Sequence, residues 1–324
     1  MCEGHDKVCD TAHNDALGFG LRGVFMTEFS ATDAALEGFR VTRENLRAVG
    51  IWAVVEFAFS VLNVIVLVSL GGAAFHRLAG LTPDDMMKLG PSALNDIALG
   101  LVPAYLAVLP LALSVQTLLT CAIYRAASGE AAGKLGFLKI GKTEYRTLGA
   151  SLLIGLVLTG CYIGGVLAVT LILVIGKQIG GEGLAGLVAF VGLGTLICGL
   201  IYLYVRLTLA VPLAFQTGRI DIKAAFRASS GRFWTFLGVY LMALLLGLLV
   251  AMLGGVINLV VQHLLSTAWR QAGDLLTAKD LSLATVLHPI VLAATLVGAV
   301  IGTLFRVIVT APSYALYRAL QTRF

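Results

Sequence analysis

The sequence predicts an all-α, polytopic membrane protein with six transmembrane helices. It further predicts three parallel two-helix repeats, each preceded by a basic amphipathic cytoplasmic segment. Three observations carry this prediction: a scarcity of charge, six long apolar runs and a sequence phrase that occurs three times. Only 13% of the 324 residues are charged and 58% are hydrophobic, with a mean hydropathy of +0.92. A soluble domain has about 25% charged residues, so this chain has too few to cover a water-facing surface.

Each apolar run is long enough to cross a bilayer. An α-helix rises 1.5 Å per residue, so about 20 apolar residues span a hydrocarbon layer of ~30 Å. Several runs exceed this length, which predicts helices that tilt or extend beyond the bilayer. The expected spans cover about 51–72, 94–124, 149–176, 184–216, 234–263 and 284–317.

Residues 1–25 contain no apolar run of the kind that a cleavable signal peptide needs. We therefore expect a disordered N-terminal extension at 1–25 and a single six-span membrane domain at 26–324, whose first span acts as its own insertion signal. A spacing within the extension is compatible with zinc, but no hydrophobic cluster surrounds it, and we favour an extension without metal. That spacing comprises Cys2, His5, Cys9 and His13.

The distribution of Lys and Arg predicts the orientation. Eighteen of the 23 lie in the N-terminal segment, in the connections after spans two and four, at the ends of spans four and six, and in the tail. Only five lie in the remaining connections: Arg77, Lys88, Lys177, Arg270 and Lys279. The positive-inside rule then places both termini in the cytoplasm, in a bacterial-type cytoplasmic (inner) membrane.

The repeated phrase precedes each odd-numbered span. It reads FRVTRENLRAVGI at 39–51, LKIGKTEYRTLGA at 138–150 and, with one residue inserted, FRASSGRFWTFLGV at 226–239. The internal repeats cover about 30–125, 133–218 and 219–324. Because each contains two spans, they share one orientation, which permits a pseudo-threefold axis along the membrane normal.

A second phrase ends the even-numbered spans. Arg206 precedes Pro212 by six residues, and Arg306 precedes Pro312 by the same interval. In span two, Gln116 occupies the position of the arginine.

The first copy of the lead-in phrase predicts an amphipathic helix, which Ser30 or Thr32 is placed to cap. Its apolar residues fall on one stripe: Leu36, Phe39, Leu46 and Val49. We expect such segments to lie along the inner leaflet, with apolar side chains among acyl chains and cations on anionic headgroups. The alternative is ordinary flanking charge that obeys the topology rule. The expected headgroup contacts are Arg40, Arg43, Arg47, Lys139, Lys142, Arg146, Arg227 and Arg232.

Two arginines lie deep inside predicted spans. Arg206 and Arg306 lie roughly 15 Å along the helix axis from the flanking polar residues, at 1.5 Å per residue. An arginine at the centre of a lone helix costs at least ~2.5–3.5 kcal/mol. Our hypothesis is an inward-facing cluster of Glu56, Gln116, Arg206 and Arg306 with a net charge of +1, which suits an anion such as a lipid phosphate. In the alternative, the arginines reach inner-leaflet phosphates separately and Glu56 contacts water.

Prolines and glycines mark further features of the spans. Prolines bend transmembrane helices, either as hinges of a carrier or as elements of packing. Those inside spans are Pro103, Pro110, Pro212 and Pro312. Glycines four residues apart allow close helix approach. Such pairs are Gly160 with Gly164 and Gly298 with Gly302.

The stretch 204–249 resembles the membrane domain attached to some glycerophosphoryl diester phosphodiesterases, and related YciC-like bacterial inner-membrane proteins. The resemblance is carried by Arg206, Leu209, Pro212, Ala225, Phe226, Ser229, Gly231, Arg232 and Trp234. It implies a bundle in the inner membrane. The soluble phosphodiesterase domain has no counterpart among these spans, so the resemblance does not imply hydrolysis.

Two classes of function remain. The first is a non-enzymatic protein that organises or senses the envelope, or binds lipid. The second is a carrier for an anionic lipid or small anion, which would use the intramembrane cluster and the proline bends. We find no nucleophile–base pair, paired carboxylates or phosphate-binding loop, and expect no enzyme, cofactor or metal. The expected partners are anionic lipids of the inner leaflet, and no nucleic acid. The scarcity of other polar residues in the spans favours the first class.

Overall fold

The computed structural model describes residues 30–79, 81, 85, 88–131, 133, 135–264 and 287–321. The predicted N-terminal extension and its Cys/His spacing lie outside these residues. All regular structure in the described part is α-helical, which confirms the predicted class. Six segments of it are long and apolar enough to cross a membrane. They are Leu46–Gly72, Ser92–Ser128, Lys142–Ile179, Gly181–Thr217, Phe233–Val260 and Val291–Gln321.

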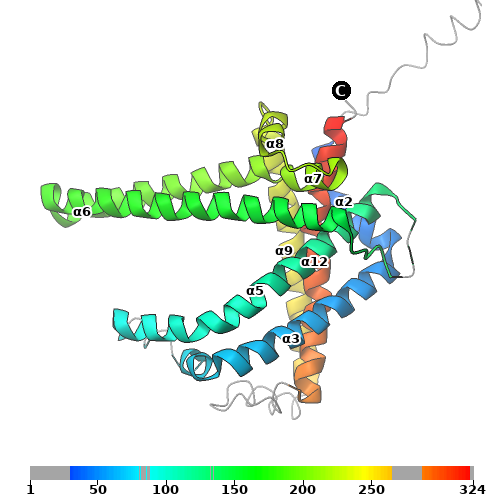
Figure 1. Cartoon of the computed structure of the whole chain (residues 1–324), viewed down its shortest axis with the longest axis horizontal. Coiled ribbons are helices and arrows are strands. Elements are labelled where there is room, and N and C mark those ends of the chain that lie inside the picture. Colours follow the sequence, from blue (N-terminus) through cyan, green and yellow to red (C-terminus); the bar gives the residue numbers. More distant parts are fainter. Residues whose placement is uncertain are drawn as a thin grey trace, which may run out of the picture.

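The first hairpin consists of α3 (Leu46–Ala79) and α5 (Pro91–Ser128). The two helices pack closely, because a Cβ on Gly100 would lie only 2.7 Å from the Cβ of Ala74. Helix α5 ends at Gly129, whose φ of 81° is accessible to glycine without strain. It is continuous through its two internal prolines, and Figure 1 shows that it bends along its length.

The second hairpin is α6 (Lys142–Leu207), whose two legs are joined at a kink at Gly181. The φ of 69° and ψ of −161° at Gly181 lie outside the helical region and are favourable for glycine alone. The second leg is interrupted at Thr208 and Leu209, and α7 (Ala210–Thr217) follows. The cause is Pro212, whose ring crowds the carbonyl group four residues earlier and which lacks an N–H group.

The third hairpin consists of α9 (Phe233–Leu264) and α12 (Pro289–Gln321), preceded by the short α8 (Ile222–Ala228). Glycines on α9 receive large side chains of α12. A Cβ on Gly254 would lie 2.7 Å from Ile301, and one on Gly247 would lie 3.0 Å from Phe305.

The glycine pairs that the sequence singled out do not make such contacts. A Cβ on any of these four residues would meet no atom within 4 Å: Gly160, Gly164, Gly298 and Gly302. Other glycines bring the helices together, since contact depends on which side of each helix faces its neighbour.

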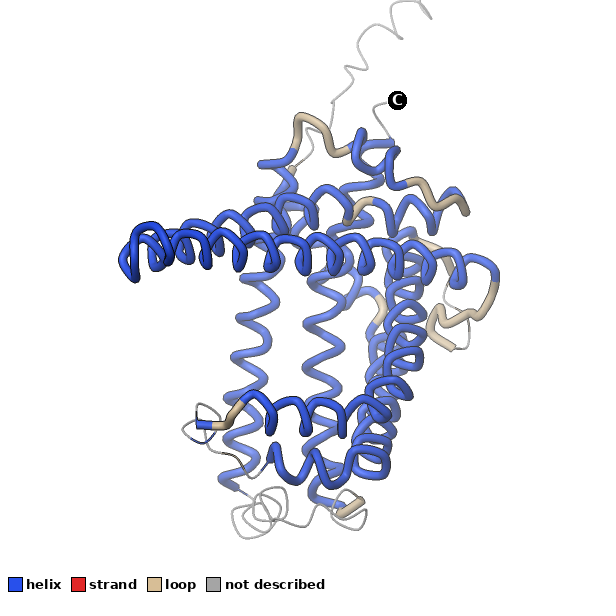
Figure 2. The backbone as a smooth tube through the Cα atoms, turned by 60° about the vertical axis from the view of Figure 1, so that its left-hand side comes forward, coloured by secondary structure: helices blue, strands red, loops and turns tan. Residues whose placement is uncertain are grey.

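The three hairpins extend in different directions from a shared junction. Figure 1 shows the α6 hairpin lying across α9 and α12, with α3 and α5 leaving the junction on a separate course. Figure 2 shows the same crossing from another side. The main hydrophobic core lies at the junction, whereas the outward part of α6 is almost entirely exposed.

The aromatic centre of the junction is formed by the three even-numbered spans. The ring centroid of Tyr124 lies 5.5 Å from those of both Phe215 and Tyr314. These residues follow Gln116, Arg206 and Arg306 by eight or nine positions. Equivalent parts of the second repeated phrase therefore converge here.

Helix α2 (Ala31–Glu44) packs against α12 at the junction. Ser30 caps it as expected, accepting a hydrogen bond from the Asp33 N–H at 3.2 Å. A Cβ on Gly38 would lie 2.4 Å from the Cα of Ile308, so the two backbones touch. In the predicted apolar stripe, Leu36, Phe39 and Leu46 are exposed, whereas Val49 is buried.

The three lead-in phrases fold differently from one another. The first comprises the last residues of α2 and the start of α3, and the third comprises the last residues of α8 and the start of α9. The second is a turn followed directly by α6, with no separate helix. The placement of these segments along a leaflet stays a prediction.

Candidate functional site

Three of the four predicted cluster residues meet inside the membrane-spanning part. Arg306 donates from Nη2 to Oε1 of Glu56 at 2.9 Å, and from Nη1 to Oε1 of Gln116. The side chains of Arg306 and Glu56 are 15% and 14% exposed. We call Glu56, Gln116 and Arg306 the three-helix cluster.

The packing of α12 explains this meeting. Helix α12 contacts both α3 and α5, and α3 crosses it obliquely. One carboxylate balances one guanidinium, so the three-helix cluster has no net charge. It links the first hairpin to the third, and it differs from the predicted site of charge +1.

Several polar atoms along the same helices are buried without a hydrogen-bond partner. They include Oε2 of Glu56, Oδ1 of Asn63 and Oγ1 of Thr303. Asn63 lies two helical turns beyond Glu56, and Thr303 lies one turn before Arg306. Several threonines in the spans donate to the carbonyl four residues earlier, as Thr295 does at 2.8 Å, but Thr303 does not.

Arg206 does not join the cluster. It is 9% exposed, and its guanidinium carbon lies 4.2 Å from the ring centroid of Phe226 and 5.2 Å from that of Tyr202. The expectation that Arg206 and Arg306 converge assumed parallel hairpins. Because α6 crosses α12 instead, equivalent positions in the repeat separate.

The cations expected to contact headgroups are accessible. Arg232 is half-buried. The other seven are exposed: Arg40, Arg43, Arg47, Lys139, Lys142, Arg146 and Arg227. Arg40 pairs with Glu37, its Nε donating at 2.9 Å, and Lys139 lies 3.6 Å from Glu130.

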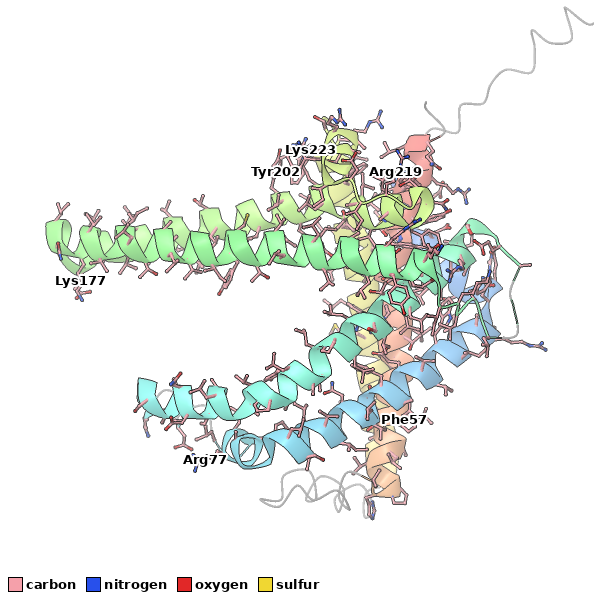
Figure 3. All side chains as sticks on the ribbon, in the orientation of Figure 1. Phe57, Arg77, Lys177, Tyr202, Arg219 and Lys223 are labelled. Atoms are coloured by element: carbon pink, nitrogen blue, oxygen red, sulfur yellow. The ribbon has the colours of Figure 1, made fainter. Side chains whose placement is uncertain are left out.

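The cations are unevenly distributed between the junction and the tips of the hairpins. Figure 3 shows Arg219 and Lys223 at the junction, and Arg77 and Lys177 at the far ends of the first and second hairpins. Within the described part of the chain, the cation-rich connections therefore lie at the junction, and the tips of the first and second hairpins carry few cations.

A second buried ion pair was not predicted. Arg125 donates from Nη2 to Glu144 and from Nη1 to the carbonyl of Phe137 at 3.0 Å. The two charged side chains are 8% and 10% exposed. Trp52 donates to the carbonyl of Gly136 at 2.7 Å. These contacts fasten the connection between the first and second hairpins, in which Phe137 has a φ of 67°.

One sequence signal was available for this pair. Arg125 ends one span and Glu144 begins the next, so a short connection brings the two residues to the same level. The positive-inside rule uses Arg125 only as a cation that predicts the topology.

Within the described ranges, no group of three or more His, Cys, Asp or Glu residues is arranged to hold a metal ion. Comparison of the chain with protein-family models, with curated proteins and with solved structures finds no match. The conclusions on function therefore depend on the residues and geometry described above.

Proposed function

We propose that this integral membrane protein is a non-enzymatic binder and organiser of anionic lipid in a bacterial cytoplasmic membrane. Both chain ends lie on the cytoplasmic side in this proposal. The observation that supports it best is the gathering of exposed cations around the junction, in contrast to the hairpin tips.

The surface of α2 and the start of α3 illustrates the basis of binding. Arg43 and Arg47 are exposed and make no ion pair with the described residues. Leu36, Phe39 and Leu46 are exposed on the same segment. Apolar side chains that enter the acyl region, with cations at headgroup level, bind anionic membrane surfaces. Each such cation contributes about 1 kcal/mol near an anionic leaflet.

The test compares cations at the junction with cations at a tip. We would extract the protein in native polymer nanodiscs and measure the anionic fraction of the co-purified phospholipid. The double variant Arg43→Gln/Arg47→Gln should lose most of the enrichment over bulk membrane. Arg77→Gln/Lys88→Gln removes the same charge at the first tip and should retain the enrichment. Equal enrichment in both variants, or none in the wild type, would refute the proposal.

The cytoplasmic position of the chain ends has its own test. A reporter enzyme active only in the periplasm, fused after residue 324, should be inactive. The same reporter inserted between Gly180 and Gly181, at the turn of α6, should be active. The reverse pattern would contradict the orientation.

A carrier for an anionic lipid or small anion is a second candidate. The unpartnered oxygens of Glu56, Asn63 and Thr303 support it, because buried polar atoms without partners are uncommon and are often satisfied by water or a ligand. A carrier needs water to reach these residues. In a cysteine-free background, Asn63→Cys and Thr303→Cys should then react with a membrane-impermeant thiol reagent, whereas Val307→Cys, a fully buried position on α12, should not. A lack of reaction at both sites would exclude an open pathway there.

A further inference from the structure

Arg206 is the buried arginine that lacks an opposite charge. Within the described ranges, it makes no ion pair or hydrogen bond, and its Nε is buried without a partner. The other two arginines buried in the junction region each contact a carboxylate. Arg125 contacts Glu144, and Arg306 contacts Glu56. The charge of Arg206 is met only by the faces of two aromatic rings.

Aromatic rings hold a guanidinium but do not satisfy its donors. The guanidinium carbon of Arg206 lies over the rings of Tyr202, one turn earlier on α6, and of Phe226 on α8. A cation–π contact places the cation over the face of a ring and supplies no acceptor to the N–H donors of the guanidinium. The planar fork matches the oxygens of a carboxylate or phosphate. Among the described residues, the Arg206 guanidinium therefore has donors without an acceptor.

In the connection nearest to Arg206, no carboxylate group contacts its guanidinium. Residues 218–232 contain one acid, Asp221, whose Oδ1 accepts from the Ala224 N–H at 2.8 Å and caps α8. The same connection has four cations, none in an ion pair with the described residues: Arg219, Lys223, Arg227 and Arg232. The local charge of this connection is strongly positive, which favours an anion that does not belong to the described residues.

The position of the site indicates how the anion arrives. Figure 3 shows Tyr202 and Lys223 together where α6 meets α8. Nearby, the ring of Trp234 lies 5.3 Å from that of Phe233 and is 79% exposed. Exposed Trp and Tyr residues beside cations are typical of the headgroup level of a bilayer. The adjoining faces of α6 and α9 expose apolar side chains, as at Leu241 and Ile201.

We propose that Arg206, stacked on Phe226 and Tyr202, binds the phosphate of one anionic phospholipid. The acyl chains of this lipid lie against the exposed faces of α6 and α9. The inference rests on the proposed lipid-binding function and names a stoichiometric site within it. It also divides the roles of the two span arginines: Arg306 links hairpins, and Arg206 binds the ligand.

The experiment measures retained lipid by native mass spectrometry of the full chain after detergent washing. Purified phosphatidylglycerol, phosphatidylethanolamine and inorganic phosphate are added back separately as probes. The wild type should retain one phosphatidylglycerol per protein. Arg206→Gln should lower its occupancy by about tenfold, the loss expected for a charge-assisted contact. Arg77→Gln, at the tip of the first hairpin, should leave the occupancy unchanged.

Two further variants keep the test independent of folding. Arg206→Lys conserves the charge but loses the planar fork, and Phe226→Leu conserves an apolar side chain but removes the ring beneath the guanidinium; each should weaken binding about threefold or more. Unchanged occupancy in Arg206→Gln and Phe226→Leu would overturn the site. Equal binding of inorganic phosphate, or of phosphatidylethanolamine, would overturn the assignment to an anionic lipid.

The outcome is separable from that of the proposed function. If Arg206→Gln keeps both the loose, salt-sensitive enrichment of anionic lipid and the tightly bound phosphatidylglycerol, the site is refuted. The proposed function then still stands. Absence of any anionic enrichment in the wild type refutes the proposed function.

Discussion

Replacing Glu56 by glutamine tests the role of the three-helix cluster. The substitution conserves the shape of the side chain and an acceptor oxygen but removes the charge opposite Arg306. The Nη2–Oε1 distance is 2.9 Å, and both side chains are about six-sevenths buried. In the variant, Gln116 still accepts from Arg306, so the guanidinium keeps a hydrogen bond and loses its counter-ion.

The expected cost follows from this geometry. Breaking a buried ion pair by removing one partner costs about 3–5 kcal/mol. Here the residual exposure and the retained amide acceptor reduce it, and we expect a loss of about 2–3 kcal/mol in the free energy of unfolding. Arg306→Gln should cost a similar amount, because it leaves Glu56 as the uncompensated charge.

The assay is a double-mutant cycle in mixed micelles, with equilibrium unfolding by a denaturing detergent. The double variant Glu56→Gln/Arg306→Gln should lose less than the sum of the single variants, with a coupling free energy of about 1.5–3 kcal/mol. Arg77→Gln at the exposed tip is the control, and should remain within about 0.5 kcal/mol of the wild type.

A coupling free energy near zero would contradict the reasoning, as would single variants as stable as the control. Either result would mean that the two charges do not hold the first and third hairpins together.

Three other substitutions test the junction by the same unfolding assay. Gly38→Val inserts a side chain where the backbones of α2 and α12 touch, and should cost about 1–3 kcal/mol or more. Trp52→Phe removes the hydrogen bond to the Gly136 carbonyl and leaves a gap where the larger ring was buried, and should cost about 1–3 kcal/mol. Glu144→Gln leaves the buried Arg125 without its carboxylate and should cost about 3 kcal/mol; an unchanged stability in any of these would refute the corresponding contact.

The six apolar spans were predictable because they depend on local properties. A run of apolar residues longer than the hydrocarbon layer must satisfy its own backbone hydrogen bonds, whatever its neighbours are. Ser30 was likewise a predictable cap, since its hydroxyl needs only the N–H three residues later. The helix break before Pro212 also has a local cause. The sequence did not predict that Pro212 interrupts its helix whereas Pro312 does not.

The candidate site was predictable only in part. Depth along a helix can be counted from the sequence, and this placed Glu56, Gln116 and Arg306 at a common level. Whether residues at one level meet depends on the direction of each hairpin. Arg206 is at the equivalent position of its repeat, but it lies on the hairpin that crosses the others.

The sequence by itself determined the helical class, the six apolar spans and the uneven distribution of cations, because hydropathy, length and charge act locally. Only the tertiary structure decided which hairpins pack together, that Arg125 pairs with Glu144, and that Arg206 is left with aromatic rings alone. The reason is that helix pairing is selected by the shapes of small residues such as Gly38 and Gly254 at particular contacts. Apolar helix faces are otherwise interchangeable in hydropathy, so composition carries no record of that choice.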